Sequence, residues 1–405
     1  MIANIVLICA VAGLIACTVY LGLVLIAAYR FRSAKKETAA GARSNIPLPP
    51  VTVLKPLHGF EPLLDQSLES FFLQDYPVFE LIFGARNAAD PALRVVKVLG
   101  RKYPNVRMEI VLSGEPEYPN AKVFLLEKMA AAASYDIIVI TDSDVRVTSG
   151  YLEEVVSPLL SPEVGLVTCL YRGVPTGGIW SLLEALGMSV EMSSGVLVAN
   201  LLEGMKFALG PTMATRKGIV DSLGGFGVLG DYCADDFVLG SLTASAGKKV
   251  VLSHHVIDHV VLNRSARESL LHQVRWMKSA RFSRQLGHIG TGLTFAIPFG
   301  LLGLAAGWMR GDWKLGLGLL GFAIANRAAM AVAVGWGVVR DRLSVAFCWL
   351  YPVRDLLGFF FWCASFLGDG IVWRGERYRL MNGGRMVRRN PPTQPPSAAT
   401  EDATL

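Results

Sequence analysis

Apolar and polar residues follow two different patterns along this chain. Residues 2–29 form an uncharged run that is longer than the ~20 helical residues needed to cross a bilayer. After the proline-rich stretch 47–50, short β-branched or alternating runs are separated by segments with helical spacing. Three further apolar stretches then follow, at 287–309, 315–339 and 345–373. The pattern predicts a folded domain between membrane segments.

The central region has the pattern of an α/β domain. The expected strands are 51–54, 80–83, 108–112 and 136–141, and the expected helices are 90–102 and 122–133. Alternation of strand and helix predicts a mostly parallel sheet with flanking helices. Such sheets bind ligands at the carboxyl ends of their strands. The first candidates for a binding site are therefore the polar residues that follow these runs, namely Lys55, 87–90 and 142–144.

The first apolar run is expected to remain as a membrane anchor. It has no basic start, and it exceeds the ~7–15 apolar residues of a signal peptide. Four basic residues follow it directly and favour a cytoplasmic position for the next domain: Arg30, Arg32, Lys35 and Lys36. The predicted order is an anchor at 1–30, a linker at 31–50, a cytoplasmic catalytic domain at 51–284, a membrane domain at 285–373 and a basic, partly disordered cytoplasmic tail at 374–405.

The three C-terminal stretches cannot all cross the membrane if the basic tail stays on the cytoplasmic side. The segment 287–309 is predicted to be re-entrant or interfacial, because it is glycine-rich, contains Pro298 and follows an amphipathic helix. Charged residues are costly in lipid, so Arg327, Arg354 and Asp355 should face the protein or water. An ion pair between Arg354 and Asp355 is expected.

Charge and cysteine usage exclude several classes of protein. The formal net charge of +6 comes from the cluster after the anchor and from the tail, which indicates contact with anionic headgroups rather than nucleic acid. The six cysteines form no C-x-x-C pair, so neither a disulfide framework nor a cysteine zinc site is expected. A spacing that could bind zinc also occurs, but a structural or surface role is favoured for its residues, which are His254, His255, Asp258 and His259.

Asp142 and Asp144 are the strongest local signal for chemistry. They follow the apolar run 137–140, which would deliver both carboxylates to the edge of the sheet. Mg²⁺ or Mn²⁺ prefers carboxylate oxygens and is commonly also held by substrate phosphates. The pair therefore suits a nucleotide diphosphate, although a solvated turn is the alternative for an isolated Asp-x-Asp.

Two other segments allow both a structural and a functional interpretation. Asp235 and Asp236 could cap a helix, or Asp236 could be a general base that removes the proton of an attacking hydroxyl. Arg275 and Trp276 lie in an expected amphipathic helix near 268–282, which could be an interfacial anchor. Arg275 could equally neutralise phosphate while Trp276 packs near an acceptor.

The stretch 182–205 is long and apolar but is interrupted by three glutamates, Glu184, Glu191 and Glu203. It could line a cleft through which a lipid reaches Asp236, with Val196 and Leu197 in contact with the lipid. The alternative is a core helix of the folded domain.

Taken together, these segments resemble the ceramide glucosyltransferase family, glycosyltransferase family 21, from the first span to the tail. The resemblance is carried by an ordered series of short segments. They are 51–59, 74–77, 90–92, 102–106, 142–143, 165–167, Asp236, 275–276 and 373–380.

The resemblance implies an inverting, membrane-bound enzyme with a cytoplasmic GT-A domain. It would move a hexose, glucose or N-acetylglucosamine, from a UDP-sugar to the hydroxyl of a membrane lipid. The implied roles are uridine binding by Asp90, binding of metal and diphosphate by Asp142 and Asp144, and base catalysis by Asp236. Other positions that match the family near the nucleotide or in its (Q/R)-x-x-R-W signature are Lys55, Lys122, Arg275 and Trp276.

His272 departs from the family, since it replaces Gln or Arg at the first position of that signature. With 167–173 and 177–180, it looks closer to a bacterial hopanoid-pathway branch, which would place the chain in a bacterial inner membrane. Acceptor contact by His272 is an expectation. The alternatives are a processive polysaccharide synthase, which would need a channel of several spans, and an inactive membrane scaffold, which would not need these acids.

Overall fold

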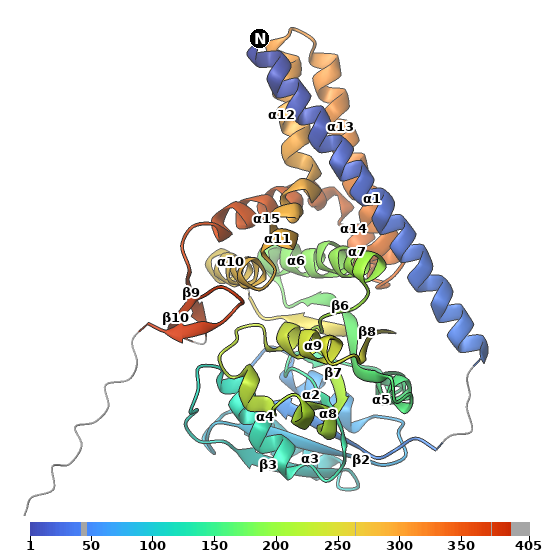
Figure 1. The fold of residues 1–405 in the computed structure, drawn as a ribbon, viewed down its shortest axis with the longest axis vertical. Helices are drawn as coiled ribbons and strands as arrows, with labels where there is room; N and C mark the ends of the chain where they lie inside the picture. Colours follow the sequence, from blue (N-terminus) through green and yellow to red (C-terminus); the bar gives the residue numbers. More distant parts are fainter. Residues whose placement is uncertain (42–46, 264, 374, 390–405) are drawn as a thin grey trace, which may run out of the picture.

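The computed structural model describes residues 1–41, 47–263, 265–373 and 375–389. It has three levels (Figure 1). An α/β domain lies at one end, a layer of helices lies across it, and three long helices project from that layer. The predicted disorder of residues 390–405 lies outside the described residues.

The α/β domain is built on one mixed sheet with the strand order β3-β2-β1-β4-β7-β6-β8-β5. Neighbouring strands β3, β2, β1 and β4 are parallel, whereas β7 runs antiparallel to both β4 and β6. The GT-A-like α/β fold class predicted from the sequence is confirmed. The strands are β1 (Val51–Pro56), β2 (Phe79–Ala85), β3 (Arg107–Leu112), β4 (Ile137–Ile140), β5 (Val145–Arg146), β6 (Val164–Pro175), β7 (Met213–Arg216) and β8 (Lys249–Val261).

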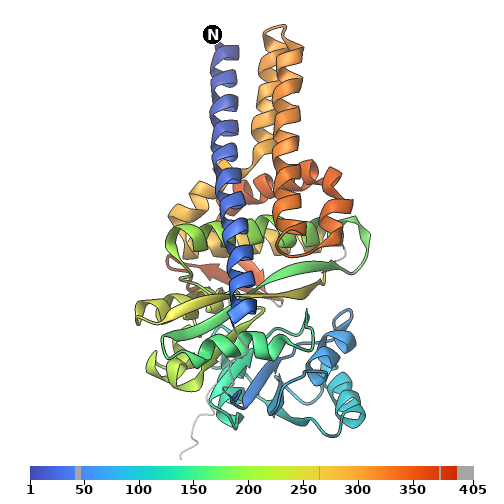
Figure 2. The ribbon, with the colours of Figure 1, turned by 90° about the vertical axis from the view of Figure 1, so that its right-hand side faces the viewer.

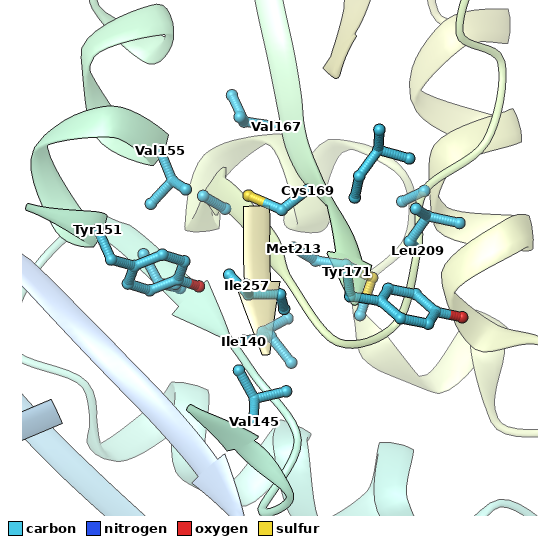
Figure 3. Packing of buried hydrophobic residues seen from close by; sticks show 14 of the residues in the cluster. Ile140, Val145, Tyr151, Val155, Val167, Cys169, Tyr171, Leu209, Met213 and Ile257 are labelled. Atoms are coloured by element: carbon cyan, nitrogen blue, oxygen red, sulfur yellow. The ribbon is translucent and has the colours of Figure 1, made fainter. Parts of the chain in front are cut away.

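Helices flank this sheet because their apolar faces are buried against it. In α3, for example, the buried residues Leu93, Val96 and Leu99 recur at helical spacing. Side chains from β4, β6, β7 and β8 meet in the same core (Figure 3). The flanking helices are α2 (Leu64–Phe72), α3 (Ala92–Lys102), α4 (Ala121–Ala132), α5 (Tyr151–Val156), η1 (Ser157–Leu160), α8 (Lys217–Ser222), η3 (Phe226–Leu229) and α9 (Asp235–Ser245).

The middle layer lies across the end of the α/β domain (Figure 1). Its α6–α7 segment is apolar and long enough to cross a bilayer, but it is mostly buried within the protein. Val196 and Leu197 are both buried in the main apolar cluster. Their predicted contact with lipid stays a prediction. The helices of this layer are α6 (Gly178–Gly187), η2 (Met188–Met192), α7 (Ser193–Glu203), α10 (Ala266–Ser283), α11 (Gln285–Thr291), η4 (Gly292–Thr294), α14 (Arg342–Ala346), η6 (Cys348–Leu350) and α15 (Tyr351–Ser365).

The projecting helices are α1 (Ile2–Gly41), α12 (Ala296–Met309) and α13 (Trp313–Met330), the last continued by η5 (Ala331–Trp336). They lie side by side in both views (Figures 1 and 2). At the far end, the guanidinium of Arg310, just after α12, donates to the side chain of Asn4. Exposed Trp308 and Trp313 flank this tip, as is typical of a membrane interface. The helices therefore indicate a membrane protein.

The C-terminal apolar stretches differ in how they are arranged. Residues 285–309 are bent by 47° between η4 and α12. Helix α12 leads away from the middle layer, and α13 packs against it and returns the chain to that layer (Figure 2). The last apolar stretch instead forms α15, which lies across the base of the projecting helices (Figure 1). A bend of this kind fits either a broken span or a re-entrant segment, so the prediction that 287–309 is re-entrant or interfacial stays a prediction.

The expected ion pair between Arg354 and Asp355 was wrong. Arg327 Nη1 lies 3.2 Å from Asp355 Oδ1, and Arg354 Nη2 lies 2.8 Å from Glu191 Oε2. Adjacent residues on a helix point in different directions, so each finds a partner on another element. All three predicted charges are nevertheless buried in protein, as expected.

Two structural elements extend across predicted domain boundaries. Helix α1 continues to Gly41, past the expected end of the anchor at residue 30. The end of the expected membrane domain and the start of the expected tail form a separate three-stranded sheet. Its antiparallel strands are β9 (Gly370–Trp373), β10 (Glu376–Leu380) and β11 (Met386–Arg388).

This arrangement predicts the sidedness of three surface positions. A cysteine introduced in place of Trp308 at the hairpin tip should react with a membrane-impermeant maleimide on one side of sealed vesicles. Cysteines replacing Glu115 in the α/β domain and Leu367 after α15 should react only on the other side. The chain without an introduced cysteine measures the background, and labelling of Leu367→Cys together with Trp308→Cys would contradict the position of α15.

Candidate active site

Two segments far apart in sequence bring four carboxylates together near Lys122. Asp142 and Asp144 follow the end of β4, and Asp235 and Asp236 open α9. The ammonium of Lys122 lies 2.7 Å from Asp142 Oδ1 and 3.9 Å from Asp235 Oδ2. Helix α4 therefore supplies the positive charge that joins the strand-end pair to the helix-start pair.

Asn120 fixes the position of Lys122. Its side-chain oxygen caps α4 by accepting from the backbone N–H groups of Lys122, at 3.0 Å, and Val123, at 3.2 Å. Its amide nitrogen donates to the carbonyl of Tyr232 at 2.8 Å, shortly before Asp235. Asn120 thus ties the start of α4 to the loop before α9, a role that was not predicted from the sequence.

Two lysines compensate the charge of Asp142. Burial lowers the pKa of Lys122, but the carboxylates of Asp142 and Asp235 outweigh this effect and raise it above its usual value. Burial raises the pKa of Asp142, and the ammonium of Lys122 more than reverses this. Lys55 is fully buried, donates to the carbonyl of Asp142 and lies 4.0 Å from the ring centroid of Phe71. Burial lowers the pKa of Lys55 to about 7.

Asp144 has a different environment from Asp142. Its Oδ2 lies 3.7 Å from Nε2 of His259 on β8, while its buried Oδ1 has no hydrogen-bond partner within the described residues. Burial raises the pKa of Asp144. His259 belongs to the histidine cluster expected to be structural, and its position beside Asp144 was missed because 115 residues separate the two in sequence.

The carboxylate pair suits a hard cation that a substrate helps to hold. Within the described residues, no group of three or more histidine, cysteine or acidic side chains is placed to hold a metal by itself. Mg²⁺ commonly takes only one or two protein carboxylates and completes its coordination with water and substrate phosphates. The unpartnered oxygen of Asp144 and the neighbouring carboxylate of Asp142 fit that kind of site.

Asp236 is held in place by backbone donors. Its Oδ2 accepts from the N–H of Gly210 at 2.6 Å, and its Oδ1 accepts from the N–H of Phe237 at 2.8 Å. Burial, reinforced by the neighbouring charge of Asp235, raises the pKa of Asp236 to about 6. A carboxylate with such a pKa can take up a proton near neutral pH, which is the requirement for a general base.

Asp90 shapes the loop after β1. Both of its carboxylate oxygens lie 3.1 Å from the N–H of Gly59, and Oδ1 also accepts from the N–H of Ala92 at 2.9 Å. The carboxylate thereby connects two loops at the carboxyl ends of β1 and β2. Its predicted contact with uridine stays a prediction.

The His-x-x-Arg-Trp segment lies on α10, which contacts α6 within the middle layer and the separate sheet β9–β11. His272 Nδ1 lies 2.7 Å from Oε1 of buried Glu184, and its ring centroid lies 4.6 Å from that of Trp276. The guanidinium of Arg275 lies 5.8 Å from the ring centroid of Trp373. The sequence identified His272 but not its connection to Glu184, because the two residues are 88 positions apart.

A pocket opens next to Lys122 at the carboxyl ends of β1, β2 and β3. Residues that follow these strands, such as His58, Arg86 and Ser113, line one side of it. The pocket lies at the predicted edge of the sheet, but Lys55, 87–90 and 142–144 are not among its lining residues. Lys122 lines the pocket and contacts Asp142.

Comparison with known proteins gives a consistent result. The sequence model of glycosyl transferase family 21 matches residues 12–386. Ceramide glucosyltransferase 1 of Caenorhabditis elegans is 27% identical over 84% of this chain and 73% of that protein. Ceramide glucosyltransferase 3 of the same organism is 26% identical over 89% of this chain and 77% of that protein.

Among solved structures, the mannosyltransferase PcManGT of Pyrobaculum calidifontis in complex with GDP-Man and Mn²⁺ is similar over 86% of this chain and 98% of that chain. The identity is 19% and the TM-score is 0.47, which is too weak a similarity to inform the activity.

The position of Lys122 predicts a loss of stability when its charge is removed. Lys122→Met leaves Asp142 and Asp235 facing each other without a cation. The cost should be about 2–3 kcal/mol, below the ~3–5 kcal/mol of a fully buried pair, because the Asp142 side chain is 28% exposed. Thermal unfolding in detergent measures the effect. Lys128→Met, at an exposed position of the same helix, is the control and should be near neutral.

Proposed function

Because the chain belongs to glycosyl transferase family 21, we propose that it transfers glucose or N-acetylglucosamine from a UDP-sugar to the hydroxyl of a membrane lipid, with inversion at the anomeric carbon. The match confirms the resemblance to the ceramide glucosyltransferase family, whereas the hopanoid branch stays a prediction. The observation that carries the proposal is the separation of two carboxylate environments. Asp142 is tied to lysine, while Asp236 accepts hydrogen bonds from backbone N–H groups.

The first environment suits the diphosphate of the donor. Asp142 and Asp144 would hold Mg²⁺ or Mn²⁺ together with the phosphates, and the metal would offset the negative charge that develops on the leaving UDP. Lys122 provides a positive charge beside the same carboxylates, and Lys55 donates a hydrogen bond to the carbonyl of Asp142. Arg275 would contribute a further cation to the phosphates from α10.

The second environment suits the acceptor. Asp236 takes the proton of the lipid hydroxyl as its oxygen forms a bond to the anomeric carbon, and the bond from that carbon to the diphosphate oxygen breaks. Direct displacement inverts the anomeric configuration. The backbone hydrogen bonds to both oxygens orient the carboxylate, and its raised pKa keeps it a sufficiently strong base.

The middle layer would bring this chemistry to the membrane surface. Helices α6, α7, α10 and α15 lie between the sheet and the projecting helices (Figure 1). Exposed apolar residues on this layer could enter the headgroup region, for example Leu271, Leu286 and Phe360. The basic residues Arg30 and Arg32 favour the cytoplasmic side for the catalytic domain. His272, with Nδ1 oriented by Glu184, and Trp276 would contact a ceramide-like or hopanoid acceptor.

The proposal is tested by offering the purified chain a panel of UDP-sugars and lipid hydroxyl acceptors and identifying the product by mass. A glycolipid whose mass equals acceptor plus hexose, or plus N-acetylhexosamine, is expected. Release of UDP without any glycolipid across the panel would contradict lipid transfer, and a polymeric product would support a polysaccharide synthase instead.

Asp236→Asn should retain binding of the UDP-sugar and lose at least ~100-fold in transfer, because an amide keeps the shape of the carboxylate but cannot take up a proton. In the wild type, kcat/KM should rise with pH up to about 6 and then level off, because the base acts only when it is deprotonated. Parallel loss of donor binding and transfer in Asp236→Asn would argue against this role.

Asp144→Asn should weaken Mn²⁺ binding in the presence of UDP by at least ~10-fold, because one charged ligand is lost. Electron paramagnetic resonance of free Mn²⁺ measures this without turnover. Asp221→Asn, at an exposed position on α8, is the control. Equal Mn²⁺ affinity in the Asp144→Asn variant and the wild type would remove Asp144 from the metal site.

A further inference from the structure

We propose that the C-terminal sheet β9–β11 completes the donor site, and that the nucleobase of the UDP-sugar stacks on Trp373. This inference rests on the proposed function, since it concerns how the same donor is held. It gives a binding role to a segment of the chain that the sequence predicted to be the end of the membrane domain and a partly disordered tail.

The pocket beside Lys122 has two walls of different origin. One wall consists of residues after β1, β2 and β3, including His58, Arg86 and Ser113. The opposite wall consists of Trp373 at the end of β9 and Glu376 and Tyr378 on β10. The two walls are more than 250 residues apart in sequence, so only the folded chain forms this pocket.

The pocket adjoins the proposed diphosphate site through Lys122. Lys122 belongs to its lining, and the ammonium of Lys122 lies 2.7 Å from Asp142 Oδ1. A nucleoside diphosphate with its phosphates at Asp142 would therefore extend its nucleoside into the pocket. A partly buried aromatic side chain there offers a flat apolar surface to a base, and stacking of this kind is worth about 1–3 kcal/mol.

The sheet is fixed to the catalytic domain, which makes it a permanent wall. The N–H of Met386 donates to the carbonyl of Asp231 at 2.7 Å, and the N–H of Cys233 donates to the carbonyl of Gly384 at 3.3 Å. Tyr378 is buried, and its hydroxyl donates to Oε2 of Glu376 at 2.6 Å. The loop that holds the sheet leads directly into Asp235 and Asp236, so this wall is connected to both halves of the active site.

The orientation of β9 provides a matched control. Neighbouring residues on a strand point to opposite faces. Val372 is 57% exposed and is absent from the pocket lining, whereas Trp373 lines it. Replacing Val372 therefore tests the effect of altering the same strand without altering the proposed contact.

The experiment measures binding of UDP and of inorganic pyrophosphate, each with Mn²⁺, by titration calorimetry on the full chain in detergent. Trp373→Ala should weaken UDP binding at least ~5-fold more than it weakens pyrophosphate binding, because Arg275 packs on Trp373 and is proposed to contact the phosphates. Val372→Ala should leave both unchanged. Unfolding temperatures of all variants are measured in parallel, and Trp373→Leu replaces Trp373→Ala if the alanine variant unfolds at lower temperature.

The outcomes separate this inference from the proposed function. Absence of UDP binding by the wild type would overturn the proposed function. If the wild type binds UDP and the Trp373 variants bind it equally well, the stacking role of the C-terminal sheet is wrong. Equal weakening of UDP and pyrophosphate would also overturn it, because the sheet would then act on the phosphates rather than the base.

Discussion

Repulsion between carboxylates is the constraint around which the catalytic half of this protein is arranged. Asp142 and Asp144 arrive from the end of β4, and Asp235 and Asp236 arrive from the start of α9. Partly buried like charges raise one another's pKa, so the group would bind protons and lose its affinity for cations without compensation. Lys122 supplies that compensation for Asp142 and Asp235 but leaves Asp236 largely with backbone partners. The pKa of Asp142, beside this ammonium group, is therefore lowered, whereas burial and the charge of Asp235 raise the pKa of Asp236.

In the middle layer and the projecting helices, ion pairs between helices compensate buried charges. Arg327 of α13 pairs with Asp355 of α15, and Arg354 of α15 pairs with Glu191 of η2 while donating to Gln273 of α10 at 2.6 Å. A buried charge that lost its partner would cost several kcal/mol, so these contacts fix how the helices lie relative to one another. They connect the projecting hairpin to the layer that carries the His-x-x-Arg-Trp segment.

The sequence was sufficient for the fold class. Strand runs and the polar residues after them predicted β1 to β4 and placed Lys55 and Asp142 at one sheet edge, because strand periodicity is a local property. Partners distant in sequence were not predictable in this way. The pairs formed by Asp144 with His259 and by His272 with Glu184 depend on how β8 and α6 pack. The C-terminal sheet was missed for the same reason, since its strands are short and its buried face is covered by the loop before α9.

Helix α10 is the element that both halves share. Its Ser269 hydroxyl donates to Glu184 of α6, within the middle layer, at 2.6 Å. Its Lys278 ammonium donates to the carbonyl of Gly370 in β9 at 2.9 Å on the side of the C-terminal sheet. The proposed function requires a water-soluble nucleotide sugar and a lipid to reach one reaction centre from two different solvents. With the proposed donor pocket bounded by β9 and β10, and His272 facing α6, α10 would separate these two routes. In the proposed reaction, a change on either face of this helix would therefore alter the relative position of the anomeric carbon and the attacking hydroxyl.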